Sequence, residues 1–306
     1  MIRRLFMDYD IIDTFLAIAD TKSLSKAAEL LFLSQSTVSY RLNALESEIG
    51  SQLVLREQGK RYVTLTNKGE EFVNIAKRWR SLYKDIAIWK TKKDIYELNI
   101  GSVDSLNTYI LYELYKRAIN IDNHLIINVS THWTVTIYKM IENYEIDLGF
   151  VLWELPYKNI KCEPMFSERM VLISSSYSKL PKIINPADLD PEKGIFMYHG
   201  PKFQLWHDNI WRNRNIRFST VDTVSLLISF MDIPDFWSIV PISVAKNLRK
   251  DNIIISEIKD PPPKRTCFKI TNKNPIPNKV RSLESFSSLL DSFLKSEFFN
   301  CILEGE

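Results

Sequence analysis

The stretch that decides the fold is residues 23–45, SLSKAAELLFLSQSTVSYRLNAL, which contains two short helical patterns separated by a tight turn. Ser23 and Ser34 are suitable N-caps, because a serine side-chain oxygen accepts a hydrogen bond from the first turn of a helix. In the second pattern three apolar residues share one face: Val38, Leu42 and Leu45. Gly50 follows and suits the left-handed position at a helix C-terminus. We therefore predict two adjacent helices, the second with one buried and one polar face.

Helical spacing extends outward from this stretch in both directions. Residues 9–49 predict three helices in total, the first with five apolar residues on one face: Ile11, Ile12, Phe15, Leu16 and Ala19. Over residues 53–66 the helical period is lost, and a charged turn centred on Gly59 separates two short extended pieces, as in a wing. Over residues 68–90 the period returns as an apolar seam: Phe72, Ala76, Trp79, Tyr83 and Ile86. Such a seam packs either on a partner helix or on its own domain.

After residue 95 short strand patterns alternate with helical ones, which indicates an α/β layer architecture. The predicted strands are residues 98–100, 125–129, 147–151, 170–174, 195–198, 218–221, 237–240 and 268–271. The predicted helices are residues 105–118, 134–142, 203–212, 223–231, 243–248 and 283–297. Asp260-Pro261-Pro262-Pro263-Lys264 predicts an extended crossover. The predicted fold class is therefore mixed, with a mostly helical N-terminal part, a long helix and a C-terminal α/β part.

Composition favours an ordinary globular protein with a basic N-terminal end. Of the net charge of +3, residues 1–90 carry fourteen Lys and Arg against eleven Asp and Glu, whereas residues 91–306 carry twenty-six against twenty-six. The whole excess lies at the N-terminal end, which favours a polyanion as partner there. No apolar run approaches membrane-spanning length, and the first residues lack the pattern of a signal peptide. We therefore predict a cytoplasmic protein that meets no membrane.

Cysteine and histidine spacing does not match a metal site. The three cysteines form no Cys-x-x-Cys pair, and the four histidines include no helix-spaced pair. The α/β part has no Gly-x-Ser-x-Gly elbow, no glycine-rich phosphate loop and no dinucleotide-binding glycine motif. We therefore predict no metal, no cofactor and no enzymatic activity. An enzyme or a solute-binding protein built on the α/β part are the alternatives.

The polar face of the helix that begins at residue 35 has side chains suited to a DNA major groove. With the apolar stripe buried, Arg41 flanks five outward positions: Gln35, Ser36, Ser39, Tyr40 and Asn43. Glutamine can bond adenine and arginine can bond guanine through two hydrogen bonds, and serine can reach bases or phosphates. On the predicted wing, three basic side chains are candidates for phosphate contacts: Arg56, Lys60 and Arg61. From the residues alone, an ordinary solvated helix face is equally compatible with this pattern.

The N-terminal sequence resembles the LysR-type transcriptional regulators. The resemblance runs over residues 8–90 and is carried by Ser23-Leu24-Ser25-Lys26-Ala27-Ala28-Glu29-Leu30-Leu31, Leu33-Ser34-Gln35-Ser36-Thr37-Val38-Ser39 and Leu65-Thr66-Asn67-Lys68-Gly69. It continues more weakly through Leu98-Asn99-Ile100-Gly101, Glu145-Ile146-Asp147-Leu148-Gly149-Phe150 and Val240-Pro241. Such a resemblance implies a sequence-specific DNA-binding transcriptional regulator that acts as a homodimer or homotetramer. A small-molecule effector, whose identity the sequence does not reveal, is expected to modulate it.

The resemblance also implies a division into three domains. These are a winged helix-turn-helix over residues 1–66, a linker or dimerisation helix over residues 67–94, and an effector-binding domain over residues 95–306. The last is expected to resemble type II periplasmic binding proteins, with subdomain I at residues 95–168 and 268–306 and subdomain II at residues 169–267. On promoter or operator DNA the implied contacts are those of Gln35, Ser36, Ser39, Arg56 and Thr66.

In an open α/β domain, ligands gather where strands end and helices begin. Three such places are predicted here: Ser102-Val103-Asp104-Ser105, Thr131-His132-Trp133-Thr134 and Tyr198-His199-Gly200-Pro201-Lys202-Phe203. The resemblance implies effector contacts near Ser105, Thr134 and Lys202. The candidate effector-binding residues are Ser102, Ser105, His132, Trp133, Thr134, Tyr198 and Lys202. Ordinary helix capping explains each of these residues equally well.

Bulky side chains distinguish this predicted effector site from the family pattern. His132 and Trp133 stand where a small glycine or proline is common in the family, and Trp153 and Trp237 are expected nearby. Asp104, beside a helix start, would repel an anion unless a cation such as Lys202 faced it across the cleft. We therefore predict a narrow, aromatic cleft that takes a ring-bearing or apolar ligand rather than a small inorganic anion.

Overall fold

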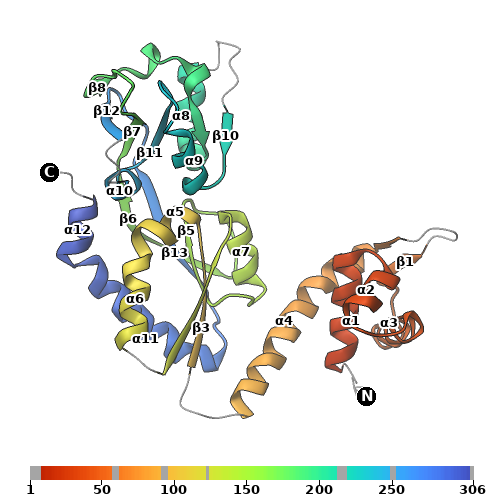
Figure 1. The fold of residues 1–306 in the computed structure, drawn as a ribbon. Coiled ribbons are helices and arrows are strands. Elements are labelled where there is room, and N and C mark those ends of the chain that lie inside the picture. The colour runs from red at the N-terminus through yellow and green to blue at the C-terminus, as the bar shows by residue number, and fades with distance from the viewer. Residues whose placement is uncertain are drawn as a thin grey trace. The chain divides into compact units, whose positions relative to one another are not determined.

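The computed structural model describes residues 8–56, 62–90, 96–121, 124–211, 219–248 and 253–303, which belong to two compact units (Figure 1). The first unit comprises Met1–Asp94 with Asn143–Glu145, and the second comprises Ile95–Glu142 with Ile146–Glu306. Each unit has a hydrophobic core of its own. No described helix is long and apolar enough to cross a membrane.

The first unit consists of three helices, a small hairpin and a long helix. Its elements are α1 (Tyr9–Thr21), α2 (Leu24–Leu30), α3 (Gln35–Ile49), β1 (Val54–Arg56), β2 (Val63–Leu65) and α4 (Asn67–Lys90). Strands β1 and β2 pair antiparallel, with Val54 opposite Leu65. The three predicted helices, the two extended pieces of the wing and the long helix are therefore confirmed.

Local capping signals set the boundaries of α2 and α3. The hydroxyl of Ser23 accepts the backbone N–H of Lys26 in the first turn of α2. The hydroxyl of Ser34 accepts the backbone N–H of Thr37 in the first turn of α3. Gly50 ends α3 in the left-handed conformation, with φ of 71°. These contacts confirm the predicted caps and explain why the turn between the two helices is short.

The core of the first unit joins the three-helix head to the start of α4. Phe15 of α1 meets Phe72 of α4 with ring centroids 5.3 Å apart. Gly69 allows α4 to approach β1 closely, because a Cβ there would lie 2.1 Å from the carbonyl oxygen of Leu53. Phe72 and Ala76 are buried in this core. The predicted apolar seam of the long helix therefore packs, at its N-terminal end, on its own domain.

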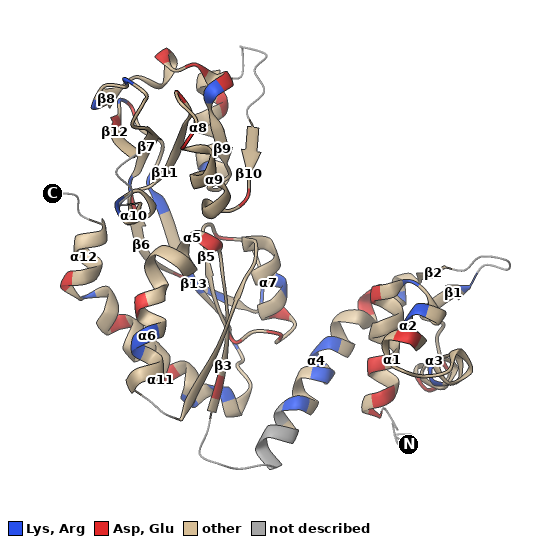
Figure 2. Cartoon of the chain, in the orientation of Figure 1, with Lys and Arg blue, Asp and Glu red and all other residues tan. Residues whose placement is uncertain are grey.

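A further side of α4 is exposed and carries three apolar side chains that are 55 %, 50 % and 45 % exposed: Ile75, Leu82 and Ile86. Figure 2 shows Lys and Arg positions spaced along the helix; these include exposed Arg78 and Lys84, and half-buried Lys77 and Arg80, which pair with Glu145 and Asp13. The apolar positions are seven and four residues apart, so they lie on one side of the helix.

The second unit contains a five-stranded sheet with the order β4-β3-β5-β13-β6, here called the β3 sheet. Its strands are β3 (Tyr96–Ser102), β4 (Leu125–Thr131), β5 (Leu148–Val151), β6 (Ile160–Glu168) and β13 (Arg265–Asn272). Strand β3 is parallel to β4 and β5, whereas β13 is antiparallel to β5 and β6. The accompanying helices are α5 (Asp104–Leu106), the π-helix η1 (Asn107–Leu111), α6 (Tyr112–Ile121), α7 (Thr134–Glu142), η5 (Pro277–Lys279), α11 (Val280–Leu294) and α12 (Glu297–Leu303).

A second sheet of the same unit has the order β11-β7-β12-β8 and is here called the β7 sheet; a separate parallel pair, β9 and β10, belongs to the same part. The strands are β7 (Met170–Ser175), β8 (Ile183–Ile184), β9 (Ile195–Met197), β10 (Ser219–Val221), β11 (Trp237–Pro241) and β12 (Ile253–Ile258). The helices are η2 (Pro186–Asp188), η3 (Pro191–Lys193), α8 (Pro201–Trp211), α9 (Val224–Phe230) and α10 (Ile242–Asn247). The predicted α/β alternation is confirmed.

The structure differs from the predicted elements at three strands and one helix. Strands β6, β8 and β12 were absent from the prediction. Strand β6 contains Pro164, which cannot donate to a sheet ladder and is tolerated because β6 lies at the edge of its sheet. The helix predicted near residues 283–297 is confirmed by α11, but α11 ends at Leu294, and a second helix, α12, which was absent from the prediction, begins at Glu297. The hydroxyl of Ser296 caps the second by accepting the backbone N–H of Phe299.

Two chain segments connect the β3 and β7 sheets. Strand β6 ends at Glu168, and β7 begins two residues later at Met170. The returning segment enters β13 at Arg265. Glu168 and Arg265 are both buried and form an ion pair at this junction. Because both side chains are buried, loss of either charge would leave the other unpaired at the junction of the two crossover strands, which is costly.

Candidate nucleic-acid interface and ligand cavity

Helix α3 has a buried side and an exposed polar side. Three apolar side chains lie inside, each at most 1 % exposed: Val38, Leu42 and Leu45. The opposite side presents half-buried Ser39 and four exposed side chains: Gln35, Ser36, Tyr40 and Asn43. A helix of this kind packs on its own domain and offers polar groups to a groove.

The first turn of α3 is ordered by side-chain hydrogen bonds. The hydroxyl oxygen of Ser34 lies 2.7 Å from that of Ser36 and 2.8 Å from that of Thr37. The Oε1 atom of Gln35 accepts a hydrogen bond of 3.3 Å from the hydroxyl of Ser25 on α2. The amide of Gln35 is thereby oriented by the neighbouring helix, which lowers the entropy that binding would cost.

Two of the predicted DNA-binding residues have partners inside the first unit. The Nη2 atom of Arg41 lies 2.7 Å from a carboxylate oxygen of Asp10, and its Nη1 atom donates to the hydroxyl of Thr14 at 3.3 Å. The hydroxyl of Thr66 accepts the backbone N–H of Gly69 at 2.9 Å and so caps α4. Arg41 therefore fastens α3 to α1, and Thr66 fixes the start of the long helix.

The wing adjoins the polar side of α3. Arg56, exposed at the end of β1, donates a hydrogen bond of 3.2 Å from Nη2 to the side-chain oxygen of Asn43 on α3. Lys60 and Arg61, the other predicted phosphate contacts, lie outside the described residues. Arg56 is thus a basic wing residue that the structure brings next to α3.

The role of Glu46 was not predicted from the sequence. Its Oε1 atom accepts the backbone N–H groups of Leu53 at 2.7 Å and Val54 at 2.9 Å, which ties the end of α3 to the start of the wing. The two N–H groups belong to a segment seven and eight residues later in the chain. No periodic pattern signals such a contact, because it depends on how the turn after Gly50 folds back.

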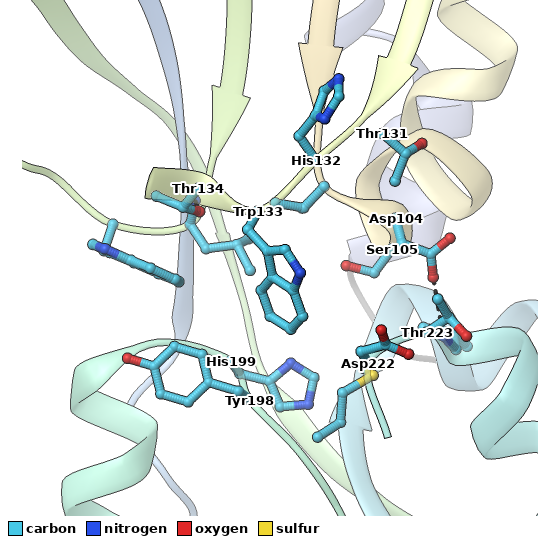
Figure 3. A pocket seen from close by; sticks show the side chains of 15 residues that line it. Asp104, Ser105, Thr131, His132, Trp133, Thr134, Tyr198, His199, Asp222 and Thr223 are labelled. Atoms are coloured by element: carbon cyan, nitrogen blue, oxygen red, sulfur yellow. Dashed lines mark hydrogen bonds between the residues drawn. The ribbon is translucent and has the colours of Figure 1, made fainter. Parts of the chain in front are cut away.

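The second unit contains a cavity of about 220 Å³ (Figure 3). It lies at the ends of strands of the β3 sheet and of the β9–β10 pair, as predicted for an open α/β domain. The wall is formed by residues 103–105, 131–134, 152–153, 197–199 and 222–224. Five of the seven predicted effector-binding residues line it: Ser105, His132, Trp133, Thr134 and Tyr198.

The other two predicted residues lie elsewhere. Ser102 is fully buried, and its hydroxyl donates to the carbonyl of Val103 at 3.4 Å. Lys202 lines a second cavity of about 260 Å³ together with Lys264 and Arg265. Three residues, Leu152, Trp153 and His199, line both cavities and separate them. Lys202 therefore does not belong to the wall that contains Asp104, because the start of α8 turns its side chain to the other cavity.

Two hydroxyls in the cavity wall receive hydrogen bonds from the protein. The hydroxyl of Ser105 accepts a hydrogen bond of 2.7 Å from Nη1 of Arg265, and that of Thr134 accepts the backbone N–H of Leu152 at 3.3 Å. A hydroxyl that accepts one hydrogen bond can still donate its own proton. Both side chains are therefore suited to bond an acceptor atom of a small molecule.

Aromatic rings form much of the remaining wall. Trp133 is 51 % exposed, and the rings of Trp153 and Tyr198 meet edge to face with centroids 5.4 Å apart. Gly200 brings the next segment against Trp153, because a Cβ there would lie 3.1 Å from the indole and φ is 113°. The predicted aromatic character of the cleft agrees with these contacts. The expectation for Trp237 is wrong, since its side chain is buried in the β7 sheet and donates to the carbonyl of Asp190.

The two histidines of the wall differ in environment. His199 is buried, and its Nε2 atom lies 3.0 Å from the carbonyl oxygen of Ile239, so the ring donates there. Burial lowers the pKa of His199 to about 3, which keeps the ring neutral at pH 7. The ring of His132 points away from Trp133 and His199 (Figure 3). Within the described ranges, no cluster of three or more His, Cys, Asp or Glu side chains is suited to a metal ion.

A winged helix-turn-helix head, a long helix and an α/β unit with a cavity at the ends of its strands define a class, the ligand-binding transcriptional regulators. The family described as "Bacterial regulatory helix-turn-helix protein, lysR family" matches residues 10–70. The family described as "LysR substrate binding domain" matches residues 93–287. The chain therefore belongs to the LysR family of bacterial transcriptional regulators.

Known relatives agree with this assignment. The chain is 25 % identical over 229 residues to the HTH-type transcriptional regulator CysL of Bacillus subtilis (strain 168). This match covers 72 % of this chain and 74 % of the relative. It is 30 % identical over 226 residues to a probable RuBisCO transcriptional regulator of Trieres chinensis, and this match covers 70 % of this chain and 67 % of that relative. The predicted function, a DNA-binding transcriptional regulator with an effector-binding domain, is confirmed at the level of the family.

Solved structures share the fold along nearly the whole chain. CbnR, a LysR family transcriptional regulator, superposes with a TM-score of 0.69 at 20 % identity, covering 95 % of this chain and 100 % of that one. A full-length OxyR of Pseudomonas aeruginosa gives a TM-score of 0.64 at 17 % identity, and the match covers 96 % of this chain and 97 % of that one. The predicted mixed fold class is therefore confirmed.

Proposed function

We propose that the chain binds a specific site on double-stranded DNA as a homodimer, and that a small molecule in the 220 Å³ cavity changes this binding. The observation that carries the proposal is the exposed polar side of α3 opposite a fully buried apolar stripe. In this proposal residues 1–66 bind DNA, residues 67–94 dimerise and residues 95–306 bind the effector. Residues 95–168 with 268–306 form subdomain I, and residues 169–267 form subdomain II. The protein acts in the cytoplasm.

Base recognition is assigned to the exposed residues of α3. Gln35 is the strongest candidate, because its amide is oriented at the N-terminal end of α3 and glutamine can bond adenine through two hydrogen bonds. Ser36, Ser39 and Tyr40 share the same polar side. Arg56, with Lys60 and Arg61, contacts phosphates and supplies affinity that does not depend on base sequence. Arg41 and Thr66 position α3 and α4 and have a smaller direct part in DNA contact.

The proposed dimer contact is the exposed apolar side of α4. Ile75, Leu82 and Ile86 repeat at the spacing of a helix seam and are about half exposed. A second copy of α4 would cover these side chains and remove apolar surface from water. Two DNA-reading heads held in this way would meet two half-sites of one operator. A homotetramer would be a pair of such dimers.

Effector binding in the cavity provides a physical route to regulation. The wall comes from both the β3 sheet and the β9–β10 pair, so a bound molecule favours the arrangement in which both sides contact it. Ser105 and Thr134 would donate to an acceptor of the ligand, and Trp133 would cover its body. A shift to the arrangement in which both sides contact the ligand would alter the spacing between the two DNA-binding heads of a dimer.

We assign the chain a binding role rather than an enzymatic one. The hydroxyls of Ser105 and Thr134 in the cavity accept N–H groups from Arg265 and Leu152. A serine or threonine nucleophile instead needs a general base that takes its proton. The family assignment also favours regulation over catalysis.

The test is a selection of DNA by the purified full chain from random double-stranded sequences, followed by affinity measurements on the enriched site. We expect one enriched motif and an affinity that a cell metabolite extract changes. Thr131→Trp, which places an indole in the cavity, should abolish the effect of the extract. Thr136→Trp, an exposed position on α7 outside the cavity wall, is the matched control. Failure to enrich any sequence at low ionic strength would contradict the proposal.

A further inference from the structure

The ionised side chains in the wall of the 220 Å³ cavity are of one sign. Asp104 and Asp222 contribute carboxylates, and no described lysine or arginine belongs to the wall. His199 adds no charge, because its buried ring is neutral. A charged ligand entering this cavity therefore meets carboxylates first.

The basic side chains of this region line the second cavity, although Arg265 also donates to the hydroxyl of Ser105 in the wall of the first. Lys202, Lys264 and Arg265 line the second cavity, on the far side of Trp153 and His199. Arg265 is further neutralised by its ion pair with Glu168. The described lysine and arginine side chains that line a cavity in this region therefore all belong to the second cavity, which also has the carboxylate of Glu154, whereas the first has the carboxylates of Asp104 and Asp222 and no described lysine or arginine.

A backbone feature that would attract an anion is already occupied by the protein. The start of α9 borders the cavity at Val224, and its backbone N–H would suit an anionic group. This N–H donates instead to a carboxylate oxygen of Asp104 at 2.9 Å. An anionic ligand would have to displace Asp104 and remain next to its charge, which opposes anion binding here.

Aromatic faces add to the attraction for a cation. Figure 3 shows the indole of Trp133 extending into the space between Tyr198 and Asp222. Trp133 is 51 % exposed and Asp222 is exposed, so both are accessible from the cavity. The face of an indole attracts a cation within about 6 Å of the ring centroid. Trp133 and Asp222 together therefore offer a ring face and a carboxylate to the same positive group.

We propose that the effector of this protein is a small organic cation, an ammonium compound with a ring-bearing or apolar body, which pairs with Asp222 and packs on Trp133. The inference rests on the proposed function, since it names the ligand class of the same cavity. A volume of about 220 Å³ lies below the range of about 300 to 1,000 Å³ that holds drug-sized ligands. The body of the ligand is therefore no larger than one ring with a short side chain.

The experiment uses the full chain and three probes that share one ring but differ in charge: benzylamine, benzyl alcohol and benzoate. Calorimetric titration at pH 7 should give the highest affinity for benzylamine, which is a cation at that pH. Asp222→Asn keeps the shape and removes the charge, and we expect about a tenfold weaker affinity for benzylamine with no change for benzyl alcohol. Asp232→Asn, an exposed carboxylate outside the cavity wall, should leave all three affinities unchanged.

Three results would overturn the inference. One is an affinity for benzoate equal to or above that for benzylamine, another is less than a twofold effect of Asp222→Asn, and the third is no binding of benzylamine. DNA affinity, measured separately, distinguishes this inference from the proposed function. Benzylamine binding that depends on Asp222 but leaves DNA affinity unchanged would support the ligand class and contradict its regulatory role.

Discussion

Arg265 donates a hydrogen bond of 2.7 Å to the hydroxyl of Ser105, which joins the junction between the two sheets to the wall of the cavity. The same guanidinium is paired with Glu168 at the end of β6. Glu168 in turn accepts the backbone N–H of Ser243, at the start of α10, at 3.1 Å. A ligand group that bonds Ser105 is therefore connected through side chains to both crossover strands.

Removal of the Ser105 hydroxyl should destabilise the second unit measurably. Ser105→Ala leaves an N–H of a buried guanidinium without its acceptor, and an unsatisfied buried group costs about 1 to 3 kcal/mol. We expect a loss of free energy of unfolding of this size in urea denaturation followed by tryptophan fluorescence. Ser102→Ala is the matched control, since Ser102 is buried nearby but donates only to the carbonyl of Val103. Equal losses in the two variants would refute a special role for the bond to Arg265.

Gln35 should determine DNA sequence preference, whereas Arg56 should determine general affinity. For Gln35→Ala we expect the affinity for the selected site to fall about tenfold or more, since a bidentate base contact contributes about 1 to 3 kcal/mol of discrimination. Its affinity for random DNA should change little. Arg56→Ala should weaken both affinities to a similar extent. The slope of log affinity against log salt concentration should fall by about one, as expected for the loss of one phosphate contact.

The measurement is an anisotropy titration of labelled duplexes at one fixed salt concentration, repeated at several salt concentrations for Arg56→Ala. Arg41→Ala serves as a comparison, because Arg41 is bound to Asp10 and Thr14 within the first unit. A larger effect on discrimination for Arg41→Ala than for Gln35→Ala would show that the assignment of base contacts is wrong.

A charge on the apolar side of α4 should disrupt the proposed dimer. Leu82 is 50 % exposed and lies between Ile75 and Ile86 on that side. Leu82→Glu would place a carboxylate in the contact between two copies, where it has no water, so the dimer should dissociate at micromolar concentration. Sedimentation velocity gives the mass directly. Lys84→Glu changes the charge about 200° away around the same helix and should leave the dimer intact; dissociation in both variants would instead indicate an effect of helix charge.

Local sequence signals were sufficient for the DNA-binding head. Ser23 and Ser34 cap the helices that follow them, and Gly50 ends α3, because each of these contacts lies within a few residues of its partner. The buried stripe of α3 follows from helix geometry alone. For the same reason the position of Gln35 on the polar side could be predicted.

Long-range packing determined what could not be predicted. Ser105 and Arg265 are 160 residues apart, and no local pattern connects them. Tyr198 and Lys202 are close in sequence, yet the start of α8 separates them into different cavities. The charge of Arg41 suggested a DNA contact, but Asp10 on another helix binds it. Each of these outcomes depends on tertiary neighbours that a single sequence does not reveal.

His199 should make the protein less stable in acid. Burial lowers its pKa from 6.5 to about 3, so the unfolded chain binds a proton between these values while the folded chain does not. The free energy of unfolding is therefore unaffected by this group above pH 6.5 and falls as the pH decreases towards 3. At about 1.4 kcal/mol for each pH unit, His199 accounts for a loss of about 2 kcal/mol between pH 7 and pH 5.

The measurement compares unfolding at pH 7 and pH 5 for the wild type and His199→Gln. Glutamine does not titrate and keeps an N–H donor for the carbonyl of Ile239, so the loss on acidification should be about 2 kcal/mol smaller than in the wild type. His124→Gln, at an exposed position, should behave like the wild type. An unchanged pH dependence in His199→Gln would contradict the assignment.

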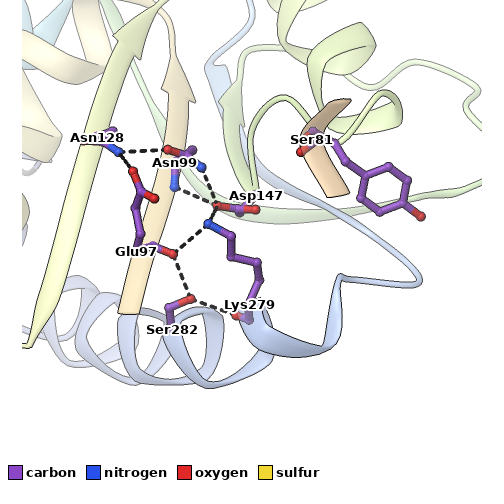
Figure 4. A network of polar contacts seen from close by, with 8 residues as sticks. Ser81, Glu97, Asn99, Asn128, Asp147, Lys279 and Ser282 are labelled. Carbon is purple, nitrogen blue, oxygen red and sulfur yellow. Dashed lines mark hydrogen bonds and ion pairs between the residues drawn. The ribbon is translucent and has the colours of Figure 1, made fainter. Parts of the chain in front are cut away.

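Lys279 and Asp147 form a buried ion pair. When this pair is broken, the free energy of unfolding should rise as the pH falls, which is opposite to the effect of His199. Their charged atoms are 3.3 Å apart, and Asp147 also accepts the backbone N–H of Asn99 at 2.8 Å, while Lys279 donates to the carbonyl of Glu97 at 3.1 Å (Figure 4). Burial raises the pKa of Asp147, and the charge of Lys279 opposes that rise. Removal of Lys279 therefore leaves a carboxylate that favours its protonated form.

We expect Lys279→Met to lower the free energy of unfolding at pH 7 by about 3 to 5 kcal/mol, because one buried charge loses its partner. Part of this loss should be recovered between pH 7 and pH 5, since the folded chain then holds a proton on Asp147 that the unfolded chain releases. The double variant with Asp147→Asn should be more stable at pH 7 than Lys279→Met alone and should lack the recovery. Urea unfolding of the three proteins at both pH values checks this. If Lys279→Met lost further stability on acidification relative to the wild type, then Asp147 would not be the unpaired group.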